Sequence, residues 1–425
     1  MRRAFLLPVV FATYSLAYLD RANFGFGAAA GLARTLGITE SRTALLGALF
    51  FVGYFAFQIP GMLWARRTSP TRLVFVALIL WGTLAALTGV IRSFAWLAVD
   101  RLLLGVAESI VFPAMLLLLT RWFTPAERSR ANSVLLLGNP LTVLWMSVIT
   151  GYLIQRFGWQ RTFVYEGLPA IAWAFAWLTW MRDSPRNARW LPVREAEALQ
   201  MAIEMERPES SSAENVTLWR VLLRGDVLLM SAQFFCWSLG AYGFVLWLPT
   251  IVKHGAGLGM GQTGLLTAVP YLLAVILMLA VSHLSDRSQR RKPYIWPMLL
   301  VSGTAMLGSF VFASQSFALA FGCIVLAGGC MYAPYGPFFS IVPERVPRAV
   351  TGEVFAMINS VGALGGFAGS YFVGLLQAVT HDQRAGFLLM ALSLLCAGLL
   401  QAMLPDVPSV RAKPLPMAIP EPDLA

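Results

Sequence analysis

Long apolar runs alternate with short polar segments along almost the whole chain. Twelve of these runs are long enough to form a helix that crosses a bilayer, which needs about 20 residues. They cover residues 5–32, 43–64, 73–91, 95–120, 131–153, 162–181, 227–252, 263–284, 294–313, 317–341, 353–379 and 385–403. The pattern therefore predicts an all-α integral membrane protein with twelve transmembrane helices.

One long polar segment divides these spans into two sets of six. Its stretch EAEALQMAIEMERPESSSAEN predicts a short surface helix followed by a flexible, Ser-rich part. We expect an N-terminal six-helix bundle over residues 1–181, a cytoplasmic linker over 182–226 and a C-terminal six-helix bundle over 227–403. Residues 404–425, which are rich in Pro, are expected to form a disordered cytoplasmic tail.

Composition agrees with a membrane protein. The chain is 58% hydrophobic and 12% charged, whereas soluble domains carry about 25% charged residues. The net charge of +11 comes from short basic clusters between the spans, which argues against nucleic-acid binding. Most of the 32 Lys and Arg residues are cytoplasmic if both termini lie inside, so the positive-inside rule predicts an N-in, C-in topology. The first apolar run is too long for a signal-peptide core of about 7–15 residues.

Cysteine and histidine provide no catalytic or metal site in this sequence. All four cysteines fall in apolar runs, where we expect packing residues and not disulfides or metal ligands. The three histidines, far apart and near span ends, are His254, His283 and His381. We expect no metal, no cofactor and no enzyme activity.

Ionisable residues occur inside the spans of the first half, although each costs about 2.5–3.5 kcal/mol at bilayer depth. They are Asp20, Arg21, Asp100, Arg101, Glu108 and Glu166, whereas the second half has Glu353 at the cytoplasmic edge of a span. We therefore place the ion chemistry in the first half. Asp100 is interpreted as a surface or gating partner and Glu166 as a helix-packing residue.

Helical spacing places several of these polar groups on shared faces. The pairs are Arg101 with Glu108, about 10 Å apart along the axis, Tyr18 with Arg21, and Tyr54 with Gln58. If spans 1, 2 and 4 converge, both arginines and both carboxylates line one cavity. The two halves also resemble each other, since TPAERSRANSVLLLGN (124–139) before span 5 is matched by VPERVPRAVTGEVFAMINSVG (342–362) before span 11. Structural repeats of this kind are typical of secondary transporters, whose binding site lies between the repeats.

Two charge types are sufficient for a coupling mechanism. The planar guanidinium of Arg21 fits a substrate carboxylate in a bidentate fork. Asp20 and Glu108 can each carry a proton, because burial favours a neutral acid and a nearby arginine favours the ionised form. The alternative is an ion pair that only locks helices together. Intramembrane ionisable groups usually mark a transport path, which favours the first interpretation.

Glycine and aromatic clusters have structural interpretations as well. The runs GAAAGLA (27–33) and GALGGFAG (362–369) indicate close helix packing, since neither has the lysine of a phosphate-binding loop. The stretch YAPYGPFF (332–339) is either an aromatic wall of the site or a span broken by Pro, and both interpretations remain open.

Four motifs together resemble one transporter family. YLDRANFGF (18–26), YFAFQIPG (54–61), RLLLGVAES (101–109) and MINSVGALGGFAG (357–369) resemble the anion:cation symporters of the major facilitator superfamily. The bacterial permeases for sugar acids such as rhamnonate and galactonate, with those for tartrate and phthalate, are the most similar members. The resemblance covers essentially the whole chain and implies two six-helix bundles.

The resemblance also implies residue roles. It assigns proton coupling to Asp20 and Glu108, carboxylate binding to Arg21, and a charge-partner or gating role to Arg101. The other candidate substrate-binding residues are Tyr18, Tyr54, Gln58, Asn139, Tyr242 and Asn359. Asn139 stands where a galactonate carrier has Gln.

The superfamily's loop motif is incomplete in the first half. GMLWARRTSPTR (61–72) has Ala65 or Arg66 where the motif has Asp, whereas SDRSQRR (285–291) keeps Asp286 and Arg287. The sequence therefore leaves undecided which residues form the inward-gate charge network of the first half.

We expect a monomeric carrier in the inner (plasma) membrane of a bacterium. It would import an organic anion, a sugar acid of aldonate or aldarate type, with protons by alternating access. The alternatives are a carrier of an aromatic or dicarboxylic acid, a proton-coupled exporter, a membrane enzyme and a sensor that binds without transport. Span 5 lacks the exporter pattern Gly-x-x-x-Gly-Pro-x-x-Gly-Gly, and no catalytic His/Asp set supports an enzyme.

Overall fold

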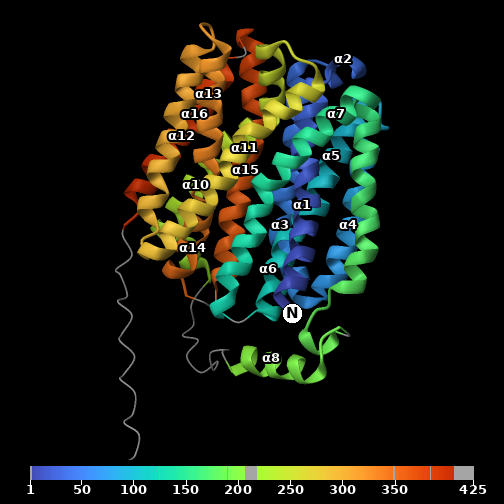
Figure 1. Cartoon of the computed structure of the whole chain (residues 1–425), viewed down its shortest axis with the longest axis vertical. Helices are drawn as coiled ribbons and strands as arrows, with labels where there is room; N and C mark the ends of the chain where they lie inside the picture. The colour runs from blue at the N-terminus through green and yellow to red at the C-terminus, as the bar shows by residue number, and fades with distance from the viewer. Residues whose placement is uncertain are drawn as a thin grey trace, which may run out of the picture.

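A computed structural model describes residues 2–123, 125–188, 190–205, 218–347, 350–382 and 384–405. Within these ranges the regular structure is helical, and two groups of long helices stand side by side (Figure 1). The predicted Ser-rich part of the linker and the predicted tail beyond residue 405 lie outside the described residues.

The first half of the chain forms the blue to green group of helices in Figure 1. Its elements are α1 (Arg2–Ala29), α2 (Leu32–Leu36), α3 (Glu40–Arg67), α4 (Pro70–Thr88), α5 (Phe94–Ser109), α6 (Val111–Trp122) and α7 (Pro125–Trp180). Spans 5 and 6 both lie in α7, which is broken at Gly158, where φ is 78° and ψ is 162°. A residue without Cβ adopts this conformation without steric cost, so the turn between the two spans needs no separate loop.

The second half forms the yellow to red group. Its elements are α10 (Gly225–Ala256), α11 (Met260–Ser288), α12 (Trp296–Phe312), α13 (Phe317–Tyr332), α14 (Tyr335–Arg345), α15 (Thr351–Thr380) and α16 (Ala385–Met403). The span predicted over 317–341 is interrupted between α13 and α14 at Pro334. Proline lacks the N–H that would continue the helical hydrogen bonds, which explains the break.

The segment between the two groups contains the predicted surface helix. This is α8 (Val193–Met205), which lies below the bundles near the N-terminus in Figure 1. Ala196, Leu199 and Ile203 are buried along one face of α8, as an amphipathic helix requires. The short helix α9 (Leu218–Leu222) was not predicted.

The twelve predicted spans are confirmed. Among the described residues, ten stretches are long and apolar enough to cross a membrane, and one of them, Val134–Trp180, contains spans 5 and 6. The remaining span is α1, whose apolar run carries Asp20 and Arg21. The fold is therefore an all-α membrane protein of two six-helix bundles.

Helices of one bundle pack directly against helices of the other. The contacting pairs are α3 with α15, α7 with α11, and α1 with α10. At the end that carries α2, the Lys253 ammonium donates a hydrogen bond to the Ala29 carbonyl at 2.6 Å. There the backbone N–H of Gly261 also donates to Gln155 Oε1 at 2.9 Å. Both bonds join the two bundles.

Glycines allow helices to touch backbone to backbone, between the bundles at α1 and α10 and within the second bundle at α15 and α10. A Cβ on Gly25 of α1 would collide with the carbonyl oxygen of Leu246 on α10, and one on Gly365 of α15 would collide with that of Phe235. The interpretation of residues 362–369 as a close-packing run is therefore confirmed.

We expect Gly25→Ala to destabilise the folded protein by about 1–3 kcal/mol, because the new methyl group has no space against a backbone carbonyl. The measurement is the apparent Tm of the purified protein in detergent. Gly225→Ala is the matched control, since a Cβ there meets nothing within 4 Å. Equal Tm values for the two variants would contradict the close approach.

Candidate functional site

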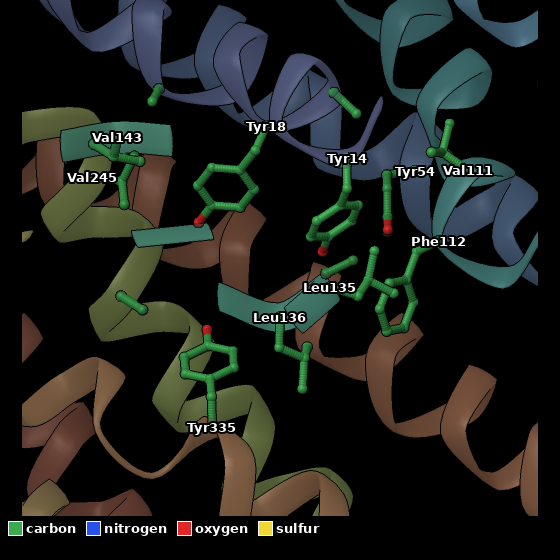
Figure 2. Close-up of a cluster of buried hydrophobic side chains, with 14 of the residues drawn as sticks. Tyr14, Tyr18, Tyr54, Val111, Phe112, Leu135, Leu136, Val143, Val245 and Tyr335 are labelled. Atoms are coloured by element: carbon green, nitrogen blue, oxygen red, sulfur yellow. The ribbon is translucent and has the colours of Figure 1, made fainter. Parts of the chain in front are cut away.

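A small cavity lies between the two bundles. Side chains of the first and the second half of the chain both line it. The lining residues are Tyr14, Arg21, Phe51, Tyr54, Phe112, Leu136, Asn139, Tyr242, Tyr335, Phe339, Asn359, Gly362 and Ala363. In Figure 2 the hydroxyl groups of Tyr14, Tyr18 and Tyr335 point into a common space.

Five of the predicted binding residues lie on this wall. They are Arg21, Tyr54, Asn139, Tyr242 and Asn359. Among the lining residues that the structure describes, Arg21 is the only charged one. The cavity thus offers one cation for an anionic ligand.

Arg21 contacts both the cavity and a buried acid. Its Nε donates a hydrogen bond to Glu108 Oε2 at 2.9 Å. The guanidinium carbon lies 4.5 Å from the centroid of the Tyr54 ring and 5.3 Å from that of Phe50. These cation–π contacts hold the charge at the wall. The bond to Glu108 uses Nε, and the two terminal nitrogens take no part in it.

The proposed proton carriers lie behind this wall. Glu108 is 0% exposed and Asp20 is 2% exposed, and neither lines the cavity. Asp20 is the neighbour of Arg21 on α1 and is therefore rotated by about 100° around the helix, away from the wall. Glu108 Oε1 and Asp20 Oδ1 have no hydrogen-bond partner among the described residues.

Arg101 also lies behind the wall and is 2% exposed. Its guanidinium carbon is 4.5 Å from the centroid of the Phe24 ring and 5.6 Å from that of Phe50. Its Nε has no hydrogen-bond partner in the part of the chain that is described. The cavity expected from the sequence, with both arginines and both acids on its wall, therefore differs from the one observed. Arg21 reaches the space and the other three stand behind it.

Tyr18 and Gln58, two further binding candidates, are buried beside the cavity and do not line it. The Tyr18 ring centroid lies 5.6 Å from the guanidinium carbon of Arg21. Gln58 Oε1 accepts a hydrogen bond from Ser360 Oγ at 3.3 Å. This bond joins α3 to α15, because the Gln58 amide faces the helix interface and not the cavity.

Several aromatic members of the wall were not predicted from the sequence. Tyr14 lies two helical turns before Arg21, so its position on the same face could have been found by spacing. Tyr335 and Phe339 come from YAPYGPFF, and there the two open interpretations both hold: the span is broken at Pro334 and its aromatic residues line the cavity. No local pattern marks Phe51 or Phe112.

The two remaining acids of the first half have structural partners. Asp100 Oδ2 accepts a hydrogen bond from Thr88 Oγ1 at 2.7 Å, and Asp100 is buried. The surface position expected for Asp100 is therefore wrong, because this carboxylate joins α5 to α4. Glu166 accepts from Asn23 Nδ2 at 3.0 Å and from the Thr150 hydroxyl, which agrees with a packing role between α7 and α1.

Side-chain bonds at the helix ends lie beside both segments of the loop motif. In the second half, Arg291 pairs with Asp286 and donates from Nε to Glu344 Oε1 at 3.2 Å, which joins α11 to α14. In the first half, Asp183 Oδ1 accepts a hydrogen bond from the backbone N–H of Thr71 at 2.9 Å. A carboxylate from the segment after span 6 thus stabilises the start of α4, next to the loop that lacks the motif's Asp.

Comparison with known proteins identifies the family. A model of the Major Facilitator Superfamily matches residues 10–370. A quinolone resistance transporter of Acinetobacter baumannii is 28% identical over 396 residues, which cover 92% of this chain and 91% of that protein. A putative tartrate transporter of Agrobacterium vitis is 27% identical over 405 residues, which cover 94% and 89% of the two chains.

A solved structure shows the same fold. The crystal structure of a D-xylose-proton symporter superposes with a TM-score of 0.76 at 13% identity, and covers 96% of this chain and 99% of that chain. The superfamily consists of transporters and not enzymes. This chain is a multi-pass membrane protein with bacterial relatives, in agreement with the expected inner-membrane location. The chain belongs to the major facilitator superfamily.

Proposed function

We propose that the protein imports a small organic anion together with protons. The observation that carries this proposal is the position of Arg21, which lines the cavity and is hydrogen-bonded to the buried Glu108 at 2.9 Å. The same guanidinium can therefore serve either an internal acid or a substrate carboxylate, and exchange between the two links the anion to the proton.

The coupling follows from the cost of an unpaired buried charge. An anion that enters the cavity competes with Glu108 for Arg21, because a carboxylate fits the guanidinium fork in a bidentate manner. Once Arg21 turns to the substrate, Glu108 is a buried carboxylate without its counter-charge, which costs several kcal/mol. Uptake of a proton by Glu108 removes that cost. Binding of the anion and binding of the proton therefore favour each other.

Asp20 and Arg101 are a second acid and a second arginine that lie behind the wall. Each is buried and has an atom without a hydrogen-bond partner among the described residues, Oδ1 in Asp20 and Nε in Arg101. We assign Asp20 as a second proton carrier and Arg101 as its charge partner, since an unsatisfied buried acid is more stable when neutral.

Transport requires the cavity to open to each side in turn. Residues 1–181 and 227–403 act as the two moving units, and the end that carries α8 is the cytoplasmic one. The bonds Lys253–Ala29 and Gln155–Gly261 join the bundles at the opposite end. They would have to break when the cavity opens outward.

The names of relatives support an organic anion. One is called a putative tartrate transporter and another a hexuronate transporter of Bacillus subtilis, and the sugar acid expected from the sequence belongs to the same broad class. The relative named a quinolone resistance transporter supports export as a second candidate. The direction of proton-driven transport separates the two.

The test uses purified protein in liposomes with a labelled anion outside. An anion is first selected by the thermal stabilisation it gives the purified protein, since binding to the folded state raises stability. We expect a gradient that is acidic outside to drive accumulation, and a protonophore to abolish it. Uptake that does not respond to the proton gradient would contradict symport, and extrusion by an inward proton flux would favour the exporter.

A further inference from the structure

We infer that Lys253 and Arg34 form an anion-capture site at the outer mouth of the carrier, separate from Arg21, and that Lys253 also closes this mouth. The ligand is a carboxylate anion of the kind that the cavity receives. The inference rests on the proposed function for the orientation of the chain. It adds a first binding step, which precedes the contact of the anion with Arg21.

Lys253 lies where α10 of the second bundle meets the end of α1 of the first, at the end of the molecule that carries α2 (Figure 1). Its side chain is half-buried, and its ammonium donates a hydrogen bond to the Ala29 carbonyl at 2.6 Å. This acceptor is a neutral backbone oxygen. An ammonium forms stronger hydrogen bonds with an ionised acceptor, so a carboxylate can compete for it.

A helix cap is the alternative interpretation of this bond. Ala29 is the last residue of α1, where carbonyls lose their helical partners and a nearby cation is favourable. The adjacent Ala28 carbonyl accepts from the Gly31 N–H of the same segment, whereas Ala29 is capped by a side chain of the other bundle. A cap of this kind has to break whenever the bundles separate at this end. The bond is therefore a latch as well as a cap.

A second cation stands next to this ammonium. Arg34 on α2 is exposed and repels Lys253 electrostatically. In the part of the chain that is described, neither of the two is paired with an acid, whereas Arg384 at the same end is paired with Asp382 at 2.8 Å. A carboxylate accepts several charge-assisted hydrogen bonds at once. An anion between Lys253 and Arg34 would therefore relieve the repulsion and provide both with a partner.

The charge of the outer face favours the approach of an anion. Under the proposed orientation, the outer segments carry seven Lys or Arg residues and two acids, Glu40 and Asp382. The basic residues are two in 33–42, one in 92–94, two in 154–161, one in 253–262 and one in 380–384. A surface with an excess of one sign raises the local concentration of oppositely charged ligands and their rate of association.

The latch and the capture site use the same ammonium in turn. While the mouth is closed, Lys253 bonds to Ala29. When the bundles separate, the ammonium loses that carbonyl and faces the entering anion together with Arg34. The anion therefore binds the open mouth better than the closed one, and a ligand shifts an equilibrium by its differential affinity for the two states. An anion outside the cell thus favours the opening through which it enters.

A cysteine in place of Ala44 reports this opening. Ala44 on α3 is 0% exposed, and a Cβ on Gly374 of α15 would lie 2.6 Å from its methyl group, so it is covered by the second bundle. In right-side-out vesicles, a membrane-impermeant maleimide reaches Ala44→Cys once the bundles part. We expect Lys253→Met to raise the labelling rate of this reporter about three- to tenfold without any ligand, because one hydrogen bond is lost.

Arg92→Gln is the matched control for the latch. Arg92 is an exposed arginine of the outer face, and its substitution removes one positive charge without a change in the bond to Ala29. The labelling rate should equal that of the reporter protein. An unchanged rate in Lys253→Met, or the same increase in Arg92→Gln, would overturn the latch.

Galacturonate and its uncharged methyl ester test the capture site in the same vesicles at equal ionic strength. We expect galacturonate to raise the labelling rate at least about twofold in the reporter protein, and the ester to have no effect. The increase should persist when Arg21→Lys is added, because the mouth binds the anion independently of the cavity. It should disappear in Arg34→Gln and in Lys253→Met.

The outcomes separate the capture site from the proposed function. No response of the reporter protein to galacturonate, a full response in Lys253→Met, or loss of the response in Arg21→Lys would overturn the capture site and leave the anion carrier intact. A response that needs Lys253 and Arg34, in a protein that shows no proton-driven uptake, would support the capture site and overturn the proposed function.

Discussion

Glu108→Gln is expected to abolish proton-driven accumulation of the anion while leaving binding and exchange measurable. Gln has nearly the same shape as Glu but neither ionises nor carries a proton. The bond from Arg21 Nε to the Glu108 carboxylate becomes a bond to a neutral amide, which competes less for the guanidinium. We therefore expect the anion to bind at least as tightly as in the wild type, with an affinity that no longer depends on this proton.

Two assays in liposomes separate these effects. Accumulation under a proton gradient should fall to the level seen with a protonophore, whereas exchange of labelled for unlabelled anion should continue. Glu166→Gln is the matched control, since Glu166 is also a buried acid but bonds to the neutral groups of Asn23 and Thr150. Gradient-driven accumulation should survive in that control. Loss of anion binding in Glu108→Gln would count against a proton-carrying role.

Arg21→Lys is expected to weaken anion binding about 10- to 100-fold. Lysine keeps the positive charge, but it is a point charge and lacks the planar fork that binds a carboxylate through two parallel hydrogen bonds. One lost hydrogen bond to a charged group is worth about 1.5–3 kcal/mol, which corresponds to this range. Calorimetry with the purified protein measures the change.

Arg42→Lys provides the control for this substitution. The Arg42 guanidinium also stacks on an aromatic ring, with its carbon 5.3 Å from the centroid of Phe94, but it does not line the cavity. Its affinity for the anion should equal that of the wild type. An Arg21→Lys protein with near-normal affinity would remove Arg21 from the binding site.

The fold was predictable because hydrophobic length alone reports a membrane span. The last span, 385–403, coincides with α16. The predicted gap between spans 5 and 6 does not appear as a loop, since its polar residues remain helical and the chain turns at Gly158. Polar residues are compatible with a helix that has left the bilayer, so a hydropathy pattern cannot distinguish such a helix from a loop.

The charged part of the site was predictable for a related reason. A charge within an apolar run is conspicuous, and Arg21 and Glu108 were found in this way. The sequence could not show that Arg21 lines the cavity while Glu108 lies behind it, because this depends on how α1 and α5 are rotated in the folded bundle. The aromatic wall was missed at Phe51 and Phe112, since phenylalanine is common in membrane spans and a ring that lines a cavity has the same local sequence signal as one that faces lipid.

Proton uptake on anion binding tests the shared use of Arg21 most directly. Calorimetry of the purified protein with the anion selected by thermal stabilisation, in two buffers with different heats of ionisation, gives the number of protons taken up per bound anion. We expect about one proton in the wild type, with an affinity that falls as pH rises, and none from this site in Glu108→Gln. The same proton count in both proteins, or no uptake by the wild type at any pH, would contradict the account.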